Sequence, residues 1–177
     1  LREIVGPERM STGESVLDLH GRDESFHDRR RPEVVIWPLT TEEISQILKM
    51  ANKKRIPVTP WGAGTSVEGN PIPVEGGILL SLQQMNHILE LRTEDLQVRV
   101  EAGVVYKELN QYLSRHGLFF PPDPGASATI GGMVGNNASG IRTIKYGATK
   151  DFILNMVIVL SSGETIRTGT NAIKSSS

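Results

Sequence analysis

Residues 122–147 read PDPGASATIGGMVGNNASGIRTIKYG, and this stretch decides how the fold of the chain is interpreted. Thirteen of its 26 residues are Gly, Ala, Ser or Thr, and only Asp123, Arg142 and Lys145 carry charge. So few large side chains cannot fill a hydrophobic core. Because glycine that is fixed in a folded loop loses conformational entropy, a glycine cluster indicates positive φ angles or a close approach of the backbone to another group. We therefore expect this stretch to form a bare surface against which something lies.

A second glycine cluster, PWGAGTSVEGN at residues 60–70, directly follows a short predicted strand at 56–59. It offers several consecutive backbone N–H groups and the hydroxyls of Thr65 and Ser66, and Glu68 is its only charged residue. Consecutive amides can hold a diphosphate without any cation. Two such loops in one small domain indicate a large ligand with polar and planar parts, such as a dinucleotide. The alternatives are a tight turn for the first loop and a packing seam of small residues for the second.

Neither loop matches the standard phosphate-binding motifs. Residues 64–69 and 135–140 both have the GxxxxG spacing of a P-loop, but neither is followed by the required Lys-Ser/Thr. Gly62 and Gly64 begin a Rossmann fingerprint, but Val67 stands where the third glycine is required. The sequence therefore disfavours both a P-loop enzyme and a Rossmann domain.

The composition is that of a globular protein of ordinary size. The chain has 177 residues, of which 38% are hydrophobic and 22% charged. A formal net charge of −1 gives no reason to expect a nucleic-acid partner. The absence of cysteine excludes disulfides, thiolate metal sites and a cysteine nucleophile. No segment approaches ~18 consecutive apolar residues, so we expect a cytoplasmic protein, or one that is peripheral to a membrane in a complex.

The rest of the sequence alternates between helix-like and strand-like segments. Thr40 and Glu43 have the spacing of a capping box, and apolar residues then recur with a helical period until Pro57. Strand-like segments flank this helix, and such a unit indicates at least one parallel strand pair. The expected elements are strands at 34–37, 56–59, 76–82 and 96–104, a connection with some strand character at 85–95, a helix at 106–116 that ends near Gly117, and a hairpin over 152–169 that turns at Ser162-Gly163. This order predicts an α+β or mixed α/β domain and disfavours a helical bundle or a β-sandwich.

Four segments, taken together and in this order, resemble one known family. They are PWGAGTSVEG, VRVEAGV, GLFFPPDPG and ATIGGMVGNNASGIRTIKYG. The chain is similar to the FAD-linked oxidases, whose flavin domain is of the vanillyl-alcohol oxidase/p-cresol methylhydroxylase (PCMH) type, and most similar to the D-lactate dehydrogenase and glycolate oxidase branch. The resemblance implies a PCMH-type FAD-binding fold of two α+β subdomains with FAD between them. It implies a lead-in at residues 1–33 and an FAD-binding domain at 34–177, with a first subdomain at 34–104 and a second, C-terminally incomplete one at 105–177.

The resemblance also implies which residues hold FAD. The first loop resembles the segment that binds the pyrophosphate, and the stretch at 122–147 resembles a second FAD-binding strip. The implied cofactor-binding residues are Pro60, Trp61, Gly62, Ala63, Gly64, Thr65, Ser66, Gly69, Gly103, Pro122, Asp123, Pro124, Thr129, Gly131, Gly132, Gly135, Asn136, Ser139, Gly140 and Ile141.

The sequence departs from the family pattern at two positions of the first loop. Many relatives carry arginine where Trp61 stands, and we interpret the tryptophan as a variation within this branch. Some relatives attach FAD covalently through a histidine, but the matching residue here is Thr65, so we expect non-covalent FAD. The histidines lie outside both loops and are expected at the surface or on helices: His20, His27, His87 and His116.

The family implies a function that extends beyond this chain. Relatives continue with a last FAD-binding segment and a cap domain that supplies the substrate and metal ligands, so we assign no catalytic residue and no metal ligand here. The expected parent is a dehydrogenase that passes a hydride from D-lactate or glycolate to flavin N5. Its electrons would go to a quinone, a cytochrome or an electron-transfer flavoprotein, and it would associate with other subunits or as a homodimer. The alternatives are an alkylglycerone-phosphate synthase type of flavoenzyme, a non-catalytic flavin subunit, and a domain without cofactor.

Overall fold

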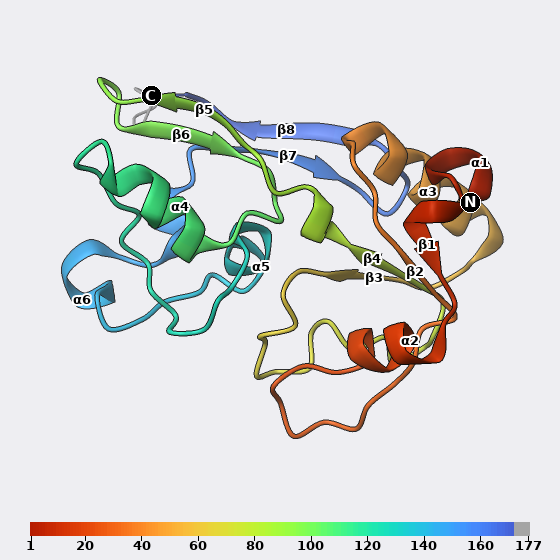
Figure 1. The fold of residues 1–177 in the computed structure, drawn as a ribbon. Helices are drawn as coiled ribbons and strands as arrows, with labels where there is room; N and C mark the ends of the chain where they lie inside the picture. The colour runs from red at the N-terminus through yellow and green to blue at the C-terminus, as the bar shows by residue number, and fades with distance from the viewer. Residues whose placement is uncertain (172–177) are drawn as a thin grey trace.

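The structure, a computed structural model, describes residues 1–171 and has two groups of elements that lie side by side (Figure 1). The first group contains α1 (Arg2–Val5), β1 (Met10–Ser11), α2 (Glu14–His20), β2 (Val34–Ile36), α3 (Thr41–Lys54), β3 (Val58–Trp61) and β4 (Ile78–Ser81). The second contains β5 (Ile88–Arg92), β6 (Gln97–Val100), α4 (Tyr106–Ser114), α5 (Ile130–Gly135), α6 (Thr143–Tyr146), β7 (Asn155–Val159) and β8 (Thr165–Gly169). Short 3-10 helices lie at Pro7–Arg9, Leu82–Gln84 and Thr149–Phe152. The predicted α+β class is confirmed.

The strands of the first group form a sheet in the order β1-β2-β4-β3. β4 is parallel to both β2 and β3, whereas β1 is antiparallel to β2. The predicted parallel pairing is therefore confirmed, but β2 and β3 each pair with β4 and not with each other. All four residues of β4 are buried, as a central parallel strand requires. β3 carries the exposed Pro60, which has no N–H to donate and is tolerated at a sheet edge.

The helix α3 begins and ends as its sequence predicts. Thr40 Oγ1 accepts a hydrogen bond of 3.1 Å from the N–H of Glu43. The Glu43 carboxylate in turn accepts from the N–H of Leu39 at 2.7 Å, and Arg9 donates to both of its oxygens at 2.7 Å each. The helix ends at Arg55, which is left-handed with a φ of 53°. Residues 1–33 are thus tied to the first sheet through β1 and through Arg9, while the division into a lead-in and two subdomains stays a prediction.

Within the second group, two antiparallel hairpins, β5–β6 and β7–β8, lie above α4 and α5 in Figure 1. Residues 85–95, expected as a connection, contain the whole of β5. The β7–β8 hairpin turns at Gly163, as predicted, with a φ of 81°. Its turn reaches α3, where the Ser45 hydroxyl donates to the carbonyl of Gly163 and Asn52 Nδ2 donates to the carbonyl of Ser161 at 3.1 Å. This hairpin therefore connects the two groups.

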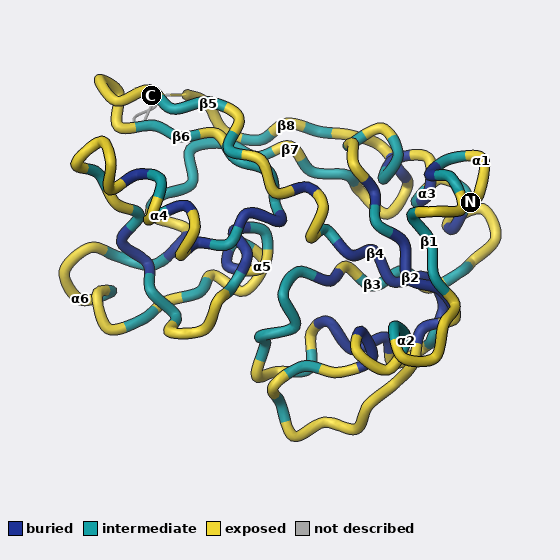
Figure 2. Tube along the Cα trace, viewed as in Figure 1, coloured by how far each residue is buried: buried dark blue, intermediate teal, exposed yellow. Residues whose placement is uncertain are grey.

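Buried side chains are divided among several clusters (Figure 2). The largest in the first group packs α3 against β2 and β4, with Ile47 and Ala51 as its helical members. In the second group, α4 buries Tyr106, Leu109 and Leu113, as its periodicity predicts. None of the helices within residues 1–171 has both the length and the hydropathy of a membrane span.

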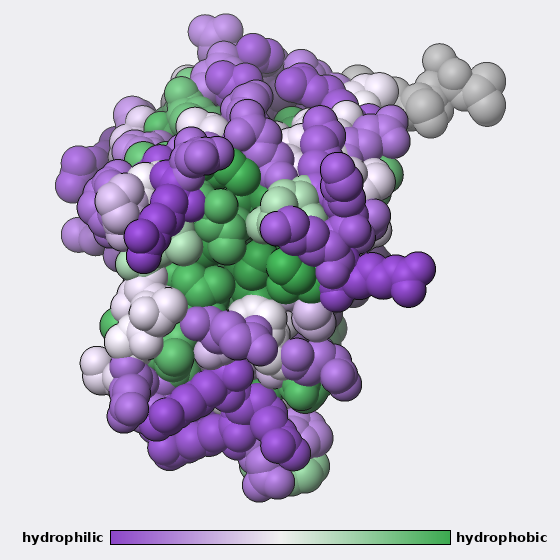
Figure 3. Space-filling model, turned by 90° about the vertical axis from the view of Figure 1, so that its right-hand side faces the viewer, coloured by the Kyte–Doolittle hydropathy of each residue, from purple (hydrophilic) through white to green (hydrophobic). Residues whose placement is uncertain are grey.

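One face of the first group is partly apolar. Figure 3, in which the right-hand side of Figure 1 faces the viewer, shows hydrophobic side chains at the centre of that face with hydrophilic ones around them. Partly buried hydrophobic residues of the N-terminal elements, among them Ile4 and Met10, pack against the α3 cluster. The N-terminal segment therefore forms part of the cover of this core.

Replacing Glu43 by Gln should weaken the tie between the N-terminal segment and α3. Both Arg9 and Glu43 are largely buried, with 18% and 17% of their side chains exposed. Loss of a charged hydrogen bond there should lower the free energy of unfolding by about 1–3 kcal/mol at pH 7, as measured in urea. The hydrogen bond from Arg9 lowers the pKa of Glu43 below its usual 4.5. The stabilisation should therefore be complete above pH 4.5 and lost as the pH falls through the lower pKa of the folded state.

The matched control is Glu42→Gln, since Glu42 is exposed on the same helical turn. Glu42→Gln should leave the free energy of unfolding unchanged both at pH 7 and below pH 4.5. Equal stability of Glu43→Gln and the wild type at pH 7 would show that the pair does not hold the segment.

Candidate cofactor-binding site

The first glycine loop follows the edge strand β3, and several of its backbone N–H groups have no hydrogen-bond partner in the part of the chain that the structure describes. Within residues 1–171, no hydrogen bond involves the backbone of Ala63, Gly64 or Thr65, or the Thr65 hydroxyl. These residues are half-buried. Because buried amides are nearly always paired in folded proteins, a run of unpaired amides indicates a ligand or solvent partner. This is the nest of donors that the sequence predicts.

Glycine is required at position 64 for two reasons. Gly64 has a φ of 68°, and a Cβ built on it would lie 2.6 Å from Cζ2 of Trp61. The backbone of the loop at Gly64 thus packs directly against the Trp61 indole. Trp61 itself is 5% exposed and packs with Val35 and Leu79. The turn that presents the amides is therefore fixed by the side chain that precedes it.

His20, at the end of α2, packs against the Trp61 indole. It is 3% exposed, and its ring centroid lies 4.5 Å from that of Trp61. Nδ1–H donates to the carbonyl of Val16 at 2.9 Å, and burial lowers the pKa of His20, so the ring is neutral at pH 7. Neither His20 Nε2 nor Trp61 Nε1 has a hydrogen-bond partner among the described residues. The expectation that His20 lies on a helix is met, but its role beneath the loop was not foreseen.

Asp23 holds the far end of the loop. Its Oδ2 accepts from the N–H of Gly69 at 2.8 Å, and the N–H of Glu24 donates to the carbonyl of Ser66 at 2.9 Å. The ring of His27 packs against the Cα of Gly69. These residues lie about 40 positions before the loop and match no motif, so a single sequence offers no signal that pairs them with it.

The second glycine stretch contains α5, and the first turn of this helix is hydrogen-bonded to the turn after β6. The N–H of Ile130 donates to the carbonyl of Val104 and that of Gly131 to the carbonyl of Ala102, both at 2.8 Å. A Cβ on Gly131 would lie 2.8 Å from that of Ala102. The neighbouring Gly103 packs against the carbonyl oxygen of Leu82, where a Cβ would overlap it. Both glycines are thus needed for contacts within the protein.

The two glycine-rich segments lie next to each other. A Cβ on Gly62 would overlap Oγ1 of Thr129, the N-cap of α5. Asn70 Nδ2 also donates to Asn136 Oδ1 at 2.9 Å, which joins the two segments a second time. Side by side, they form one surface with small residues and unpaired amides, and one extended ligand can contact both.

Residues 122–125 are held between α4 and the later part of the second glycine stretch. Asp123 Oδ1 accepts from the Tyr106 hydroxyl at 2.6 Å and from the N–H of Gly125 at 3.1 Å. Burial, followed by this bond to Asp123, raises the pKa of Tyr106 to about 12. The Tyr106 bond in turn lowers the pKa of Asp123, which is therefore ionised at pH 7. A Cβ on Gly140 would overlap the Asp123 carbonyl oxygen, so Asp123 and Gly140 both serve contacts within the protein.

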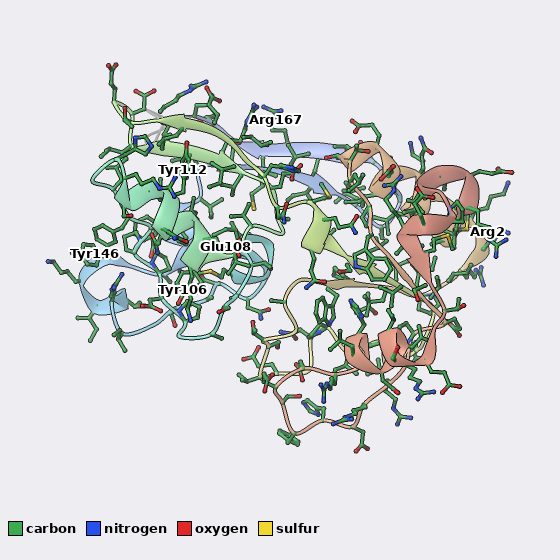
Figure 4. All side chains as sticks on the ribbon, in the orientation of Figure 1. Arg2, Tyr106, Glu108, Tyr112, Tyr146 and Arg167 are labelled. Atoms are coloured by element: carbon green, nitrogen blue, oxygen red, sulfur yellow. The ribbon has the colours of Figure 1, made fainter. Side chains whose placement is uncertain are left out.

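An open pocket of about 670 Å³ lies on the α4 side of this segment. Figure 4 shows Tyr106 on α4 and Tyr146 at the end of α6 on this side of the molecule. The pocket is lined by Tyr106, Lys107, Asn110, Phe119, Asp123, Arg142 and Tyr146. Near it, Ile141 is 89% exposed. Within residues 1–171, no group of three His, Asp or Glu side chains has the arrangement of a metal site.

The structure places the predicted site residues in several parts of the fold. Pro60 is exposed on β3, just before the first loop. The first loop and α5 with its caps lie together, and they contain Trp61, Gly62, Ala63, Gly64, Thr65, Ser66, Gly69, Thr129, Gly131, Gly132 and Asn136. Pro122, Asp123, Pro124, Ser139, Gly140 and Ile141 lie on the segments that cross after it, while Gly103 is buried and Gly135 ends α5. The uncharged donors and the lack of side chains on this surface fit the diphosphate of a dinucleotide.

Comparisons with known proteins agree with this geometry. The sequence model of a family described as "FAD binding domain" matches residues 32–169. A probable mitochondrial D-lactate dehydrogenase of Danio rerio is 42% identical over 94% of this chain and 34% of its own length. The glycolate oxidase subunit GlcD of Bacillus subtilis is 36% identical over 98% of this chain and 37% of its own. A mitochondrial D-lactate dehydrogenase [cytochrome] of Arabidopsis thaliana is 40% identical over 88% and 28%. The chain spans about a third of the length of these relatives.

Solved structures show the same fold. An alkyldihydroxyacetonephosphate synthase superposes with a TM-score of 0.82 at 22% identity, over 92% of this chain and 32% of its own. A p-cresol methylhydroxylase superposes with a TM-score of 0.81 at 24% identity, over 95% and 34%. The PCMH-type fold and the FAD cofactor expected from the sequence are confirmed. The chain belongs to the FAD binding domain family of FAD-linked oxidoreductases.

Proposed function

We propose that this chain is the FAD-holding part of a flavin-dependent 2-hydroxy-acid dehydrogenase that oxidises D-lactate or glycolate. The unpaired amides of the first loop, next to α5, are the observation that supports a bound diphosphate. The substrate class is supported by the relatives named as D-lactate dehydrogenases and as a glycolate oxidase subunit. The likeness to an alkyldihydroxyacetonephosphate synthase, at 22% identity, supports the shared fold alone.

In this proposal the backbone of residues 62–66 and the Thr65 hydroxyl bind the FAD diphosphate. The strip from Thr129 to Asn136 lies along the cofactor, and residues 122–124 lie beyond it. For Gly103, Asp123 and Gly140 the structure shows contacts within the protein, and their contact with FAD stays a prediction. Hydrogen bonds to charged acceptors contribute about 1.5–3 kcal/mol each, so a few such donors are enough to hold a diphosphate.

When bound, FAD supplies the acceptor for the hydride of the hydroxy acid, and the residues of this chain bind and orient it. Reduced flavin must pass its electrons on, and the word cytochrome in the name of one relative supports a cytochrome among the acceptors considered. Association with other subunits is supported by the name of the GlcD relative, a glycolate oxidase subunit. A cytoplasmic location stays a prediction, since two of these relatives are named mitochondrial.

Replacing Thr65 by Ala tests the proposed site without disturbing the fold. Thr65 makes no hydrogen bond within residues 1–171, so the unfolding midpoint in urea should stay unchanged. Loss of one hydroxyl donor to a phosphate should raise the Kd for FAD about tenfold, as measured by quenching of flavin fluorescence. Thr165→Ala, on an exposed position of β8, is the matched control and should change neither value. An unchanged Kd for Thr65→Ala would place the diphosphate elsewhere.

The bound FAD should be non-covalent, because threonine cannot form the bond that a histidine makes at the matching position of some relatives. Precipitation of the holoprotein with acid should release all of the yellow colour into the supernatant. Colour that stays in the pellet after washing would contradict this expectation.

The proposed reaction is tested on the full-length protein that contains this chain. Addition of D-lactate or glycolate without oxygen should bleach the oxidised flavin spectrum, and the enantiomer L-lactate is the control. Flavin that stays oxidised with both substrates, in a protein that still binds FAD, would contradict the proposed reaction and leave the proposed binding site intact.

A further inference from the structure

Residues 20–27 lie against the first glycine loop although they precede the part of the chain that the family model matches, residues 32–169. Three of these residues contact the loop. The ring of His20 packs against Trp61, the Asp23 carboxylate accepts a hydrogen bond from the N–H of Gly69, and the N–H of Glu24 donates to the carbonyl of Ser66. The loop is therefore held by residues that precede the part of the chain matched by the family model.

Asp23 is fixed on both of its oxygens. Oδ1 accepts from the N–H of Ser25 at 2.9 Å and from its hydroxyl at 2.5 Å, while Oδ2 accepts from Gly69. Burial would raise the pKa of Asp23, but the hydrogen bonds from Ser25, Gly69 and Ser66 outweigh it and hold the pKa below its usual range. The side chain is thus an ionised acceptor that is bound in one orientation. Its hydrogen bonds go to Ser25 and to the loop, which suits a role in holding the loop.

The positions that this segment holds define the shape of the loop. Ser66 follows directly after the unpaired amides of residues 63–65, and Gly69, with a φ of 80°, is where the chain turns away. On the other side, Trp61 sets the start of the loop. With Trp61, Ser66 and Gly69 all held, the amides between them stay aligned before a ligand arrives. A loop that is ordered in advance loses less entropy on binding, which raises affinity.

We propose that Asp23 is a positioning residue for FAD: it holds residues 62–69 in the form that binds the diphosphate. This inference rests on the proposed assignment of the loop to FAD. The segment before residue 32 then contributes to the cofactor site by holding the loop that binds the diphosphate.

The test compares Asp23→Ala and Asp23→Asn with Asp18→Asn in FAD-depleted protein. Asp18 is the matched control because it also precedes residue 32, forms an exposed pair with Arg31, and makes no hydrogen bond or ion pair with the loop within residues 1–171. Asp23→Ala should raise the Kd for FAD at least about tenfold, since a charged hydrogen bond is lost. Asp23→Asn should give a smaller increase, because its amide oxygen can still accept from Gly69. Asp18→Asn should leave the Kd unchanged.

Hydrogen–deuterium exchange separates positioning from general destabilisation. In the FAD-free protein, Asp23→Ala should speed exchange at the hydrogen-bonded amides of Glu24 and Gly69, which join the two segments, and leave α3 and β4 unchanged. The lost hydrogen bonds should lower the urea midpoint only slightly. Faster exchange throughout the first group, α3 and β4 included, would overturn the inference in favour of a merely structural role. If Asp23→Ala does not fold, Asp23→Asn provides the same comparison.

Thr65→Ala, measured in parallel, distinguishes this inference from the assignment on which it rests. A higher Kd for Thr65→Ala with an unchanged Kd for Asp23→Ala would overturn the role of Asp23 and leave the site standing. Unchanged Kd values for both variants would overturn the assignment of the loop to FAD, and the positioning role with it.

Discussion

The backbone of residues 62–69 must satisfy two requirements that oppose each other. The amides of residues 63–65 have to stay unpaired within the protein so that a ligand can use them, yet unpaired amides give this part of the loop no hydrogen-bond ladder of its own. The loop is therefore held through other atoms. The indole of Trp61 packs against Gly64, and Thr129 packs against Gly62. Asp23 and Glu24 form hydrogen bonds with Gly69 and Ser66 at the C-terminal end of the loop. Most of the side-chain arrangement around this edge of the first sheet follows from that constraint.

The second glycine stretch meets a different demand. Several of its glycines allow one chain segment to cross another: Gly131 on Ala102 and Gly140 on the carbonyl of Asp123. These crossings hold the start of α5 against the turn after β6 and hold Gly140 against Asp123. The bare surface expected from the sequence is thus produced partly by packing of the protein against itself. The packing-seam interpretation, which the sequence leaves as an alternative, therefore holds at Gly131 and Gly140, while a cofactor surface on this stretch stays a proposal.

Periodicity predicted most of the regular elements, because α3 and α4 each bury one apolar face and the strands are short apolar runs. The helix α5 was not predicted, since glycines at 131 and 132 disfavour a helix and its first turn is set by long-range bonds to Ala102 and Val104. The order of the sheet was also beyond the sequence pattern, because the central position of β4 is decided by burial on both faces. The loops of the site could be predicted from their composition, whereas His20 and Asp23 could not, since their contacts join positions about 40 residues apart.

The central claim is that the amides of the first loop bind the FAD diphosphate beside α5. The most direct measurement is the ¹H–¹⁵N correlation spectrum of this 19.4 kDa chain during titration with FAD. The account predicts that the largest shift changes fall on the amides of residues 62–66 and 129–136. Saturating FAD that leaves those amides unmoved, with changes confined to the pocket around Tyr106 and Arg142, would contradict it.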